Sequence, residues 1–234
     1  MHKRILLKIS GEELSGEHDN GVDPEVIKWI AGEAKKVVDK GCGLVIVAGA
    51  GNLVRGVEVA GNGIKRVTAD QMGMLSGLIN AMAMTDIFES CGVPTRCLSN
   101  IFVQQVAENY VYRLAEKHLD NNRVLIIAGG IGRPYATHDS AAVSLGLELD
   151  CDLVLKATKV DGVYDKDPMK FPGAKRYEQV SYQEALENPD IKVMDKSAMG
   201  LAAEYKKHII VYNLHEKDAL ARIVNGEPVG TLIS

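Results

Sequence analysis

The sequence predicts an α/β protein, a three-layer αβα sandwich with a largely parallel central sheet. Short apolar runs of strand length alternate along the chain with longer helical stretches, as they do in α/β folds. The runs are continuously apolar, which is typical of strands buried on both faces of a parallel sheet. The expected strands are Ile5–Ile9, Leu44–Ala48, Val124–Ala128, Leu153–Leu155 and Ile209–Tyr212.

Residues that start and stop helices mark the stretches between these runs. Asp23 and Pro24 suit the N-cap and first turn of a helix that ends near Lys40, just before Gly41. A stretch rich in Met and Ala over about Thr68–Cys91 predicts a second helix, ended by Gly92-Val93-Pro94. Later helices are expected at about Gln104–Leu119, from about Asp139, at Lys196–Lys207 and at Glu216–Asn225.

The chain of 234 residues has no repeat, low-complexity tract or linker, and a single domain over residues 1–234 is expected. A loose division into two lobes falls near residue 150. The longest irregular stretch, Asp165–Lys175, is rich in Pro and Gly and predicts a structured loop.

Charge and composition exclude several classes of protein. The chain has 27 Lys plus Arg against 31 Asp plus Glu, a net charge of −4, so it has no global attraction for nucleic acid or an anionic membrane. No stretch is long and apolar enough for a signal peptide or a membrane span. The four cysteines lack metal-site spacing, and we expect them to be small buried side chains in a reducing compartment, the cytoplasm.

Three glycine-rich segments follow expected strands, at the sheet edge where α/β proteins bind ligands. They are Lys8–Gly11, Gly49–Gly56 and Gly129–Arg133. Glycine lets backbone N–H groups approach phosphate oxygens closely, and Lys8 and Arg55 add full positive charge. A single such loop is more often a tight turn, but three at one edge favour an anion site.

Familiar catalytic motifs are absent: GxxxxGK[ST], a complete GxGxxG, the protein-kinase signatures and HExxH. His138 beside Asp139 suggests a catalytic pair, but adjacent residues do not face each other on a helix, and Asp139 equally suits an N-cap. The cluster Met72–Met84 fits either core packing or a subunit contact.

Six motifs in the same order carry a family resemblance from residue 3 to residue 233. They are KISGEEL (8–14), GAGNLVRG (49–56), DQMGML (70–75), HDSAA (138–142), KATKVDGVYDKDP (156–168) and VMD (193–195). The sequence resembles the bacterial UMP kinases of the amino acid kinase superfamily. The long motif is typical of the superfamily, and DQMGML after GNLVRG narrows the resemblance to the UMP kinase branch.

The resemblance implies an enzyme that transfers the γ-phosphoryl group of ATP to UMP with Mg²⁺, in pyrimidine nucleotide biosynthesis. It implies a homohexamer without nucleic-acid or membrane partners. An acceptor lobe would span about residues 1–150 and an ATP lobe about 151–234. A phosphate nucleophile is already anionic, so the reaction needs positioning and charge neutralisation rather than a general base.

Site residues follow from the resemblance position by position. Lys8 and Arg55 would be catalytic, neutralising charge on the transferred group and clamping the meeting phosphates. The implied ATP site comprises Lys8, Ser10, Gly11, Gly51, Arg55, Thr158, Tyr164 and Asp167. The implied UMP site comprises Ala50, Asp70, Gly132, Arg133, Thr137 and His138, with Asp70 holding the ribose hydroxyls. Asp139, Asp167 and Asp195 are unranked candidates for Mg²⁺.

Four residues depart from the family pattern at the acceptor site. Ala50 stands in place of a glycine, and we expect its methyl group to crowd a phosphate or to forbid a positive φ. Ile131, Arg133 and His138 replace Thr, Asn and Thr. These changes leave two alternatives open: a relative that phosphorylates another small acceptor, and a non-enzymatic protein that binds or stores an oxyanion.

Overall fold

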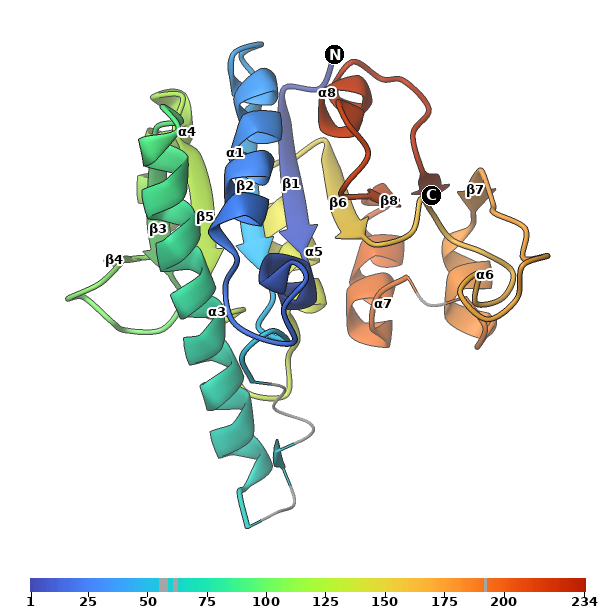
Figure 1. Cartoon of the computed structure of the whole chain (residues 1–234), viewed down its shortest axis with the longest axis horizontal. Coiled ribbons are helices and arrows are strands. Elements are labelled where there is room, and N and C mark those ends of the chain that lie inside the picture. The colour runs from blue at the N-terminus through green and yellow to red at the C-terminus, as the bar shows by residue number, and fades with distance from the viewer. Residues whose placement is uncertain (55–58, 61–62, 192) are drawn as a thin grey trace.

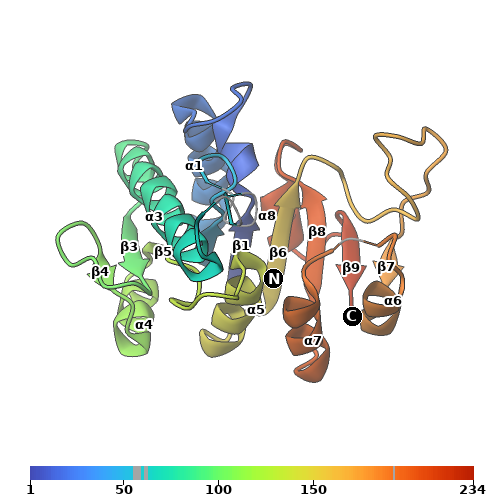
Figure 2. The same ribbon diagram turned by 90° about the horizontal axis from the view of Figure 1, so that it is seen from below.

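The computed structural model of the chain describes residues 1–54, 59–60, 63–191 and 193–234. Its described strands form one nine-stranded sheet in the order β4-β3-β5-β2-β1-β6-β8-β9-β7. Neighbouring strands run parallel except for β8 and β9, and helices cover both faces (Figure 2). The expected three-layer α/β sandwich with a largely parallel sheet is confirmed.

All five strands expected from apolar runs are present: β1 (Arg4–Ile9), β2 (Gly43–Ala48), β5 (Val124–Ala128), β6 (Leu153–Thr158) and β8 (Ile209–Asn213). They occupy the middle of the sheet, where both faces are covered (Figure 1). The sequence did not predict β3 (Thr95–Ser99), β4 (Glu108–Asn109), β7 (Gln179–Val180) and β9 (Thr231–Ile233). All four lie toward the sheet edges, where an apolar run is not required, and β4, β7 and β9 have only two or three residues each.

The helices follow the expected order: α1 (Pro24–Val38), α3 (Arg66–Ser90), α4 (Tyr112–Asp120), α5 (His138–Glu148), α7 (Lys196–Glu204) and α8 (Ala219–Val224). A short 3₁₀ helix, η1 (Gly11–Ser15), and α6 (Tyr182–Glu187) were not anticipated. Helix α1 begins as predicted, because the Asp23 side chain accepts a hydrogen bond from the backbone N–H of Glu25 at 2.9 Å.

The helix expected over Gln104–Leu119 is wrong in its first half. Residues 104–106 form a turn, and Glu108 and Asn109 then pair with the edge of β3 as β4. Helix α4 starts only at Tyr112. Pairing with an available strand edge therefore outweighed helical propensity in this segment.

Alternation along β1 sorts its side chains between the two helical layers. Ile5, Leu7 and Ile9 join the core cluster beneath α1, α3 and α8, whereas Leu6 joins the cluster beneath α5 and α7. Lys8 lies on the same face as Leu6, so its ammonium group points toward α5.

The carboxyl ends of β1, β2, β5 and β6 meet at one edge of the sheet, as parallel pairing requires. The amino-terminal half of α3 extends past this edge, at the bottom of Figure 1. The loop Asp165–Lys175 is structured as expected: the N–H of Asp165 donates to the carbonyl of Lys175, and the N–H of Lys175 donates to the Asp165 carboxylate.

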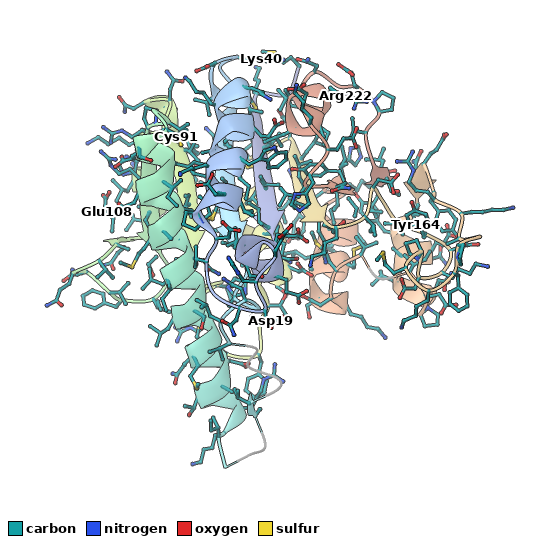
Figure 3. The ribbon with its side chains drawn as sticks, viewed as in Figure 1. Asp19, Lys40, Cys91, Glu108, Tyr164 and Arg222 are labelled. Carbon is teal, nitrogen blue, oxygen red and sulfur yellow. The ribbon has the colours of Figure 1, made fainter. Side chains whose placement is uncertain are left out.

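Three of the four cysteines are buried as expected, and all four are free thiols. The expectation is wrong for Cys91, which is exposed at the end of α3 (Figure 3). None of the described helices has the length and apolar character needed to cross a membrane.

Candidate active site

Two glycine-rich loops at the carboxyl edge are in direct contact. A Cβ atom added to Gly11 would lie 2.5 Å from the backbone nitrogen of Gly51, and one added to Gly49 would lie 2.9 Å from that of Gly11. Only glycine permits this approach, because any side chain would separate the loops. The loops after β1 and β2 thus bring backbone amides together where a phosphate could bind.

The loop after β2 is fixed from behind by two buried amides. Asn52 and Asn80 donate to each other's side-chain oxygens at 2.9 Å and 2.8 Å. Asn80 also donates to the carbonyl oxygen of Gly49 at 2.7 Å, and Asn52 donates to that of Gly21 at 2.6 Å. The asparagine of the GAGN motif is therefore an internal anchor of the loop.

A cavity of about 450 Å³ opens beside this loop. Its walls come from the loop after β2, the start of α3, and the segment between β5 and α5. The lining residues are Glu12, Ala50, Gly51, Val54, Arg66, Asp70, Gly73, Met74, Gly130, Ile131, Arg133, Ala136, Thr137 and His138. Five of the six residues expected at the UMP site line this cavity.

Gly132 is the sixth, and it lies behind the cavity wall. It has a φ of +74°, and a Cβ atom there would lie 2.5 Å from the carbonyl oxygen of Asn100. Gly132 therefore shapes the turn that places Ile131 and Arg133 in the wall. The Arg133 guanidinium has no ion pair or hydrogen bond with any described residue.

Ala50 fits the loop without backbone strain. The described non-glycine residues with a positive φ are Asn122, Tyr135, Asp150, Lys206 and Asp218, and Ala50 is not among them. The expected conflict between its methyl group and a positive φ is therefore wrong. Its side chain is 7% exposed and contributes to the cavity wall.

Asp70 lies in the first turns of α3 and joins that helix to the opposite wall. Its Oδ1 accepts a hydrogen bond from Nε of Arg66, and its Oδ2 accepts one from the backbone N–H of Tyr135, both at 2.8 Å. Arg66 also lies over the Tyr135 ring, 5.4 Å from its centre. Each carboxylate oxygen keeps capacity for a further donor, so two vicinal hydroxyl groups could bind here.

Lys8 and Lys156 share the carboxylate of Asp139. The Lys8 Nζ lies 2.9 Å from Oδ1, and the Lys156 Nζ lies 3.2 Å from Oδ2. Burial alone would raise the pKa of Asp139, but the two ammonium groups hold it below its usual value. Asp139 is therefore a carboxylate at neutral pH, and it is shared between two lysine side chains.

The start of α5 is capped by Thr137, whose Oγ1 accepts hydrogen bonds from the backbone N–H groups of Asp139 and Ser140. The Thr137 hydroxyl in turn donates to Asp195, which itself caps α7. Ser140 Oγ lies 3.3 Å from both carboxylate oxygens of Asp195. The N-terminus of α5, with its partial positive charge, is thus held at the end of the cavity.

His138 is neutral in the folded protein. Burial, together with the nearby charge of Lys8, lowers its pKa to about 4. Its Nε2 atom is buried without a partner among the described residues and faces Gly77 of α3. His138 and Asp139 do not form a catalytic pair, because the nearby carboxylate is engaged by two lysines.

A second cavity, of about 390 Å³, lies beyond the carboxyl end of β6. Tyr164 and Asp167, expected on the adenosine side, both line it, and Figure 3 shows Tyr164 near β7 and α6. Tyr164 donates to Asp161, and this bond raises the pKa of the tyrosine hydroxyl. Thr158 does not line this cavity; its hydroxyl accepts from the N–H of Val160 and donates to the Val160 carbonyl.

The expected UMP-site residues and Gly51 therefore lie at the first cavity, and Tyr164 and Asp167 lie at the second. Lys8, Ser10 and Gly11 lie at the carboxyl end of β1. Ser10 lies 3.3 Å from the Lys8 ammonium nitrogen. Arg55 lies outside the described residues, and its role stays a prediction. Sequence reasoning missed Lys156 and Asn80. For Lys156, a signal existed: both lysines interrupt an apolar run next to its carboxyl end.

A divalent metal would find few protein ligands here. Across the described part of the chain, no three His, Cys, Asp or Glu side chains gather closely enough to hold an ion. Asp139 and Asp195 already have partners, and Asp167 lies at the second cavity. These residues fit Mg²⁺ that is bound mainly by nucleotide phosphates and water, with at most one or two protein oxygens.

Comparisons with known proteins agree with this geometry. The family model described as "Amino acid kinase family" matches residues 3–213. A uridylate kinase of Methylococcus capsulatus is 44% identical over 233 residues, covering 100% of this chain and 97% of the relative. The structure of UMP kinase from Bacillus anthracis has a TM-score of 0.94 at 36% identity, covering 100% of this chain and 96% of that one. UMP kinase from Ureaplasma parvum has a TM-score of 0.91 at 30% identity, covering 100% and 99%.

Proposed function

The chain belongs to the amino acid kinase family and, within it, to the uridylate kinases, and we propose that it transfers the γ-phosphoryl group of ATP to the phosphate of UMP. The observation that carries this proposal is the junction of the loops after β1 and β2, beside the first cavity. There Lys8 and the touching loops of Gly11 and Gly51 lie at the carboxyl edge of the sheet. A donor nucleotide on one side and an acceptor on the other would bring their phosphates together at this junction.

The chemistry at the junction is charge neutralisation and alignment. The acceptor phosphate oxygen is already a nucleophile, so no side chain has to remove a proton. Lys8, the backbone amides of Gly11 and Gly51 and the N-terminus of α5 would stabilise the charge on the transferred group. We assign Arg55 the role of a bidentate clamp on the meeting phosphates.

The first cavity is our acceptor site. Asp70 would accept hydrogen bonds from both ribose hydroxyls of UMP, because each of its oxygens retains a free lone pair. Ala50, Arg133, Thr137 and His138 line the rest of the cavity. Gly132 would contribute by shaping the turn behind the wall. His138, being neutral, would offer a hydrogen bond rather than a charge.

The second cavity is our site for the adenosine of ATP. Tyr164 and Asp167 would line it, and Thr158 would shape the loop that leaves β6. The described residues around the first cavity lie in the range 12–138 and those around the second in 160–190. This separation supports an acceptor lobe over about residues 1–150 and an ATP lobe over about 151–234, within one domain.

When bound, Mg²⁺ would neutralise charge on the ATP phosphates. Asp139 and Asp195 lie at the N-terminus of α5, where their carboxylates could contact water molecules bound to the Mg²⁺ ion. Asp139 has a second task, because its position between two lysines orients the Lys8 ammonium group.

We further place the enzyme in pyrimidine nucleotide synthesis, in the cytoplasm, as a homohexamer. Four free cysteines suit a reducing compartment. Self-association is supported by an apolar stripe on α3, in which Leu75, Ile79 and Met82 are 49%, 52% and 40% exposed at helical spacing. Part of the cluster Met72–Met84 is instead core, since Met74 and Met84 are buried.

The direct test is the formation of UDP and ADP from UMP and ATP with Mg²⁺, compared with a Lys8→Met variant. We expect the parent protein to form UDP and the variant to form it more slowly by two orders of magnitude or more. This is roughly the cost of removing a charge contact to the transition state. Measuring the stabilisation by ATP and by UMP separately distinguishes a kinase from the alternative of a protein that stores an oxyanion. Each ligand at 100 times its Kd should raise the free energy of unfolding by about 2.7 kcal/mol. A protein stabilised by inorganic oxyanions but by neither nucleotide would contradict the proposal.

A further inference from the structure

Lys156 is a buried lysine at the junction to which neither the sequence nor the proposed function assigns a task. It lies on β6 as the register partner of Lys8 on β1. Side chains at paired positions of adjacent parallel strands point to the same face, so both ammonium groups reach toward α5. The Lys156 side chain is only 16% exposed. A lysine buried to this degree requires partners for its charge.

Its first partner is the carboxylate that also contacts Lys8. Asp139 places one oxygen 2.9 Å from the Lys8 nitrogen and the other 3.2 Å from the Lys156 nitrogen. With both lysines present, Asp139 cannot fully neutralise either of them. With Lys156 removed, Lys8 and Asp139 would form a neutral pair in a site of low dielectric, where such a pair is hard to separate.

Its second partner fixes the direction from which Lys156 approaches. The Lys156 ammonium group donates to the backbone carbonyl of Val193, two residues before Asp195. Asp195 caps α7 and accepts from the hydroxyl of Thr137 at the start of α5. The same lysine therefore contacts the first turn of α5 and the segment that leads into α7.

We propose that Lys156 is a positioning residue that shares Asp139 with Lys8 and so leaves the Lys8 charge available to the terminal phosphoryl group of the donor nucleotide. The inference rests on the proposed function for the identity of that donor. Lys156 itself need not touch the nucleotide. Its effect is electrostatic and passes through one carboxylate.

This arrangement predicts a selective effect of removing the charge. In Lys156→Met, Lys8 is drawn to Asp139, and its interaction with the terminal phosphate is weakened. We expect the Kd for ATP measured by calorimetry to rise about tenfold, the cost of one charge-assisted hydrogen bond. The Kd for ADP, which lacks that phosphate, should change by less than about twofold. The kcat should fall with the KM for UMP nearly unchanged.

Lys207→Met is the matched control, because Lys207 also donates to a backbone carbonyl, that of Cys151, away from Asp139. It should leave both nucleotide affinities unchanged. Thermal melts of Lys156→Met and of the milder Lys156→Gln verify that each variant is folded. Equal weakening of ATP and ADP, or no weakening of either, in a folded variant would overturn the proposal.

A double-mutant cycle separates this electrostatic role from a structural one. If Lys156 acts by sharing Asp139, the Lys156→Met substitution should have little effect on ATP affinity once Asp139→Asn has removed the shared charge. If Lys156 matters only as an anchor for Val193, the same loss should appear in both backgrounds. These binding measurements need no acceptor, so failure to phosphorylate UMP would contradict the proposed function without deciding the role of Lys156.

Discussion

Asn52 and Asn80 exchange two hydrogen bonds across the interior, joining the loop after β2 to the middle of α3. Asn80 has no exposed surface, and its remaining N–H binds the carbonyl of Gly49. The loop after β2 is thus held by side chains that are buried in the interior. Rigid support behind a loop of this kind is what pre-organises a site before the ligand arrives.

Substitution of Asn80 should therefore affect both stability and nucleotide binding. Asn80→Leu keeps the branched shape of the side chain but leaves the side-chain oxygen of Asn52 and the Gly49 carbonyl without this partner, at an expected cost of about 2–4 kcal/mol in the free energy of unfolding. Urea denaturation measures this cost. Asn225→Leu, at an exposed surface position, is the control and should cost under about 0.5 kcal/mol. A stable Asn80→Leu with full ATP affinity would refute the anchoring role.

Asp70 should determine whether the acceptor must carry both ribose hydroxyls. In Asp70→Asn, the hydrogen bonds to those hydroxyls lose their charge, and the KM for UMP should rise by about 10- to 100-fold. The preference for UMP over dUMP should shrink by a similar factor. Steady-state kinetics with both acceptors measure the effect, and ATP affinity should not change.

Asp86→Asn provides the matched substitution, since Asp86 is exposed on the same helix. Unaltered discrimination between UMP and dUMP in Asp70→Asn would place the ribose elsewhere.

His138 should make the folded protein sensitive to mild acid. The pKa of His138 is about 4 in the folded chain and near 6.5 when the side chain is exposed. Between these two pH values the unfolded chain therefore binds a proton that the folded chain does not bind. Stability from this group is thus lost as the pH falls from about 6.5 to 4, by on the order of 3 kcal/mol at most.

Denaturation of His138→Gln should consequently show a shallower loss of stability over that pH range than the parent. His18→Gln, at an exposed position, should retain the parent's slope. Identical slopes for all three proteins would mean that His138 is not buried as a neutral side chain.

The apolar stripe on α3 should be covered by another subunit. The double substitution Leu75→Glu and Ile79→Glu places two charges in the stripe and should reduce the mass measured by light scattering to that of a smaller assembly. Tyr205→Glu, which alters an exposed aromatic residue just after α7, should leave the mass unchanged. An unaltered mass in the α3 variant would show that subunits associate through a different surface.

The sequence was sufficient to predict the central strands and the sheet edge that carries the site. The reason is local, because Lys8 and Gly11 follow the apolar run that starts at Ile5. A buried strand with a loop at its end can be recognised without knowledge of the strands beside it. The edge strands β4 and β7 have only two residues each and exist because β3 and β9 offer them partners.

The contacts that the sequence did not reveal join residues far apart in the chain. Asn52 and Asn80 are 28 positions apart, and Lys156 lies beside Lys8 only because of the register between β1 and β6. Composition and periodicity contain no information on such register. The roles of Thr137 and Thr158 as local caps could have been read from their positions at a helix start and a strand end.

The most direct test of the proposed function is the selectivity of phosphoryl transfer across UMP, CMP and dUMP, with ATP and Mg²⁺ present. We expect a kcat/KM for UMP well above that for the other two, with discrimination against dUMP carried by Asp70. Turnover of none of these nucleotides would contradict it, and would show that Ile131, Arg133 and His138 have redirected the acceptor cavity to a different anion.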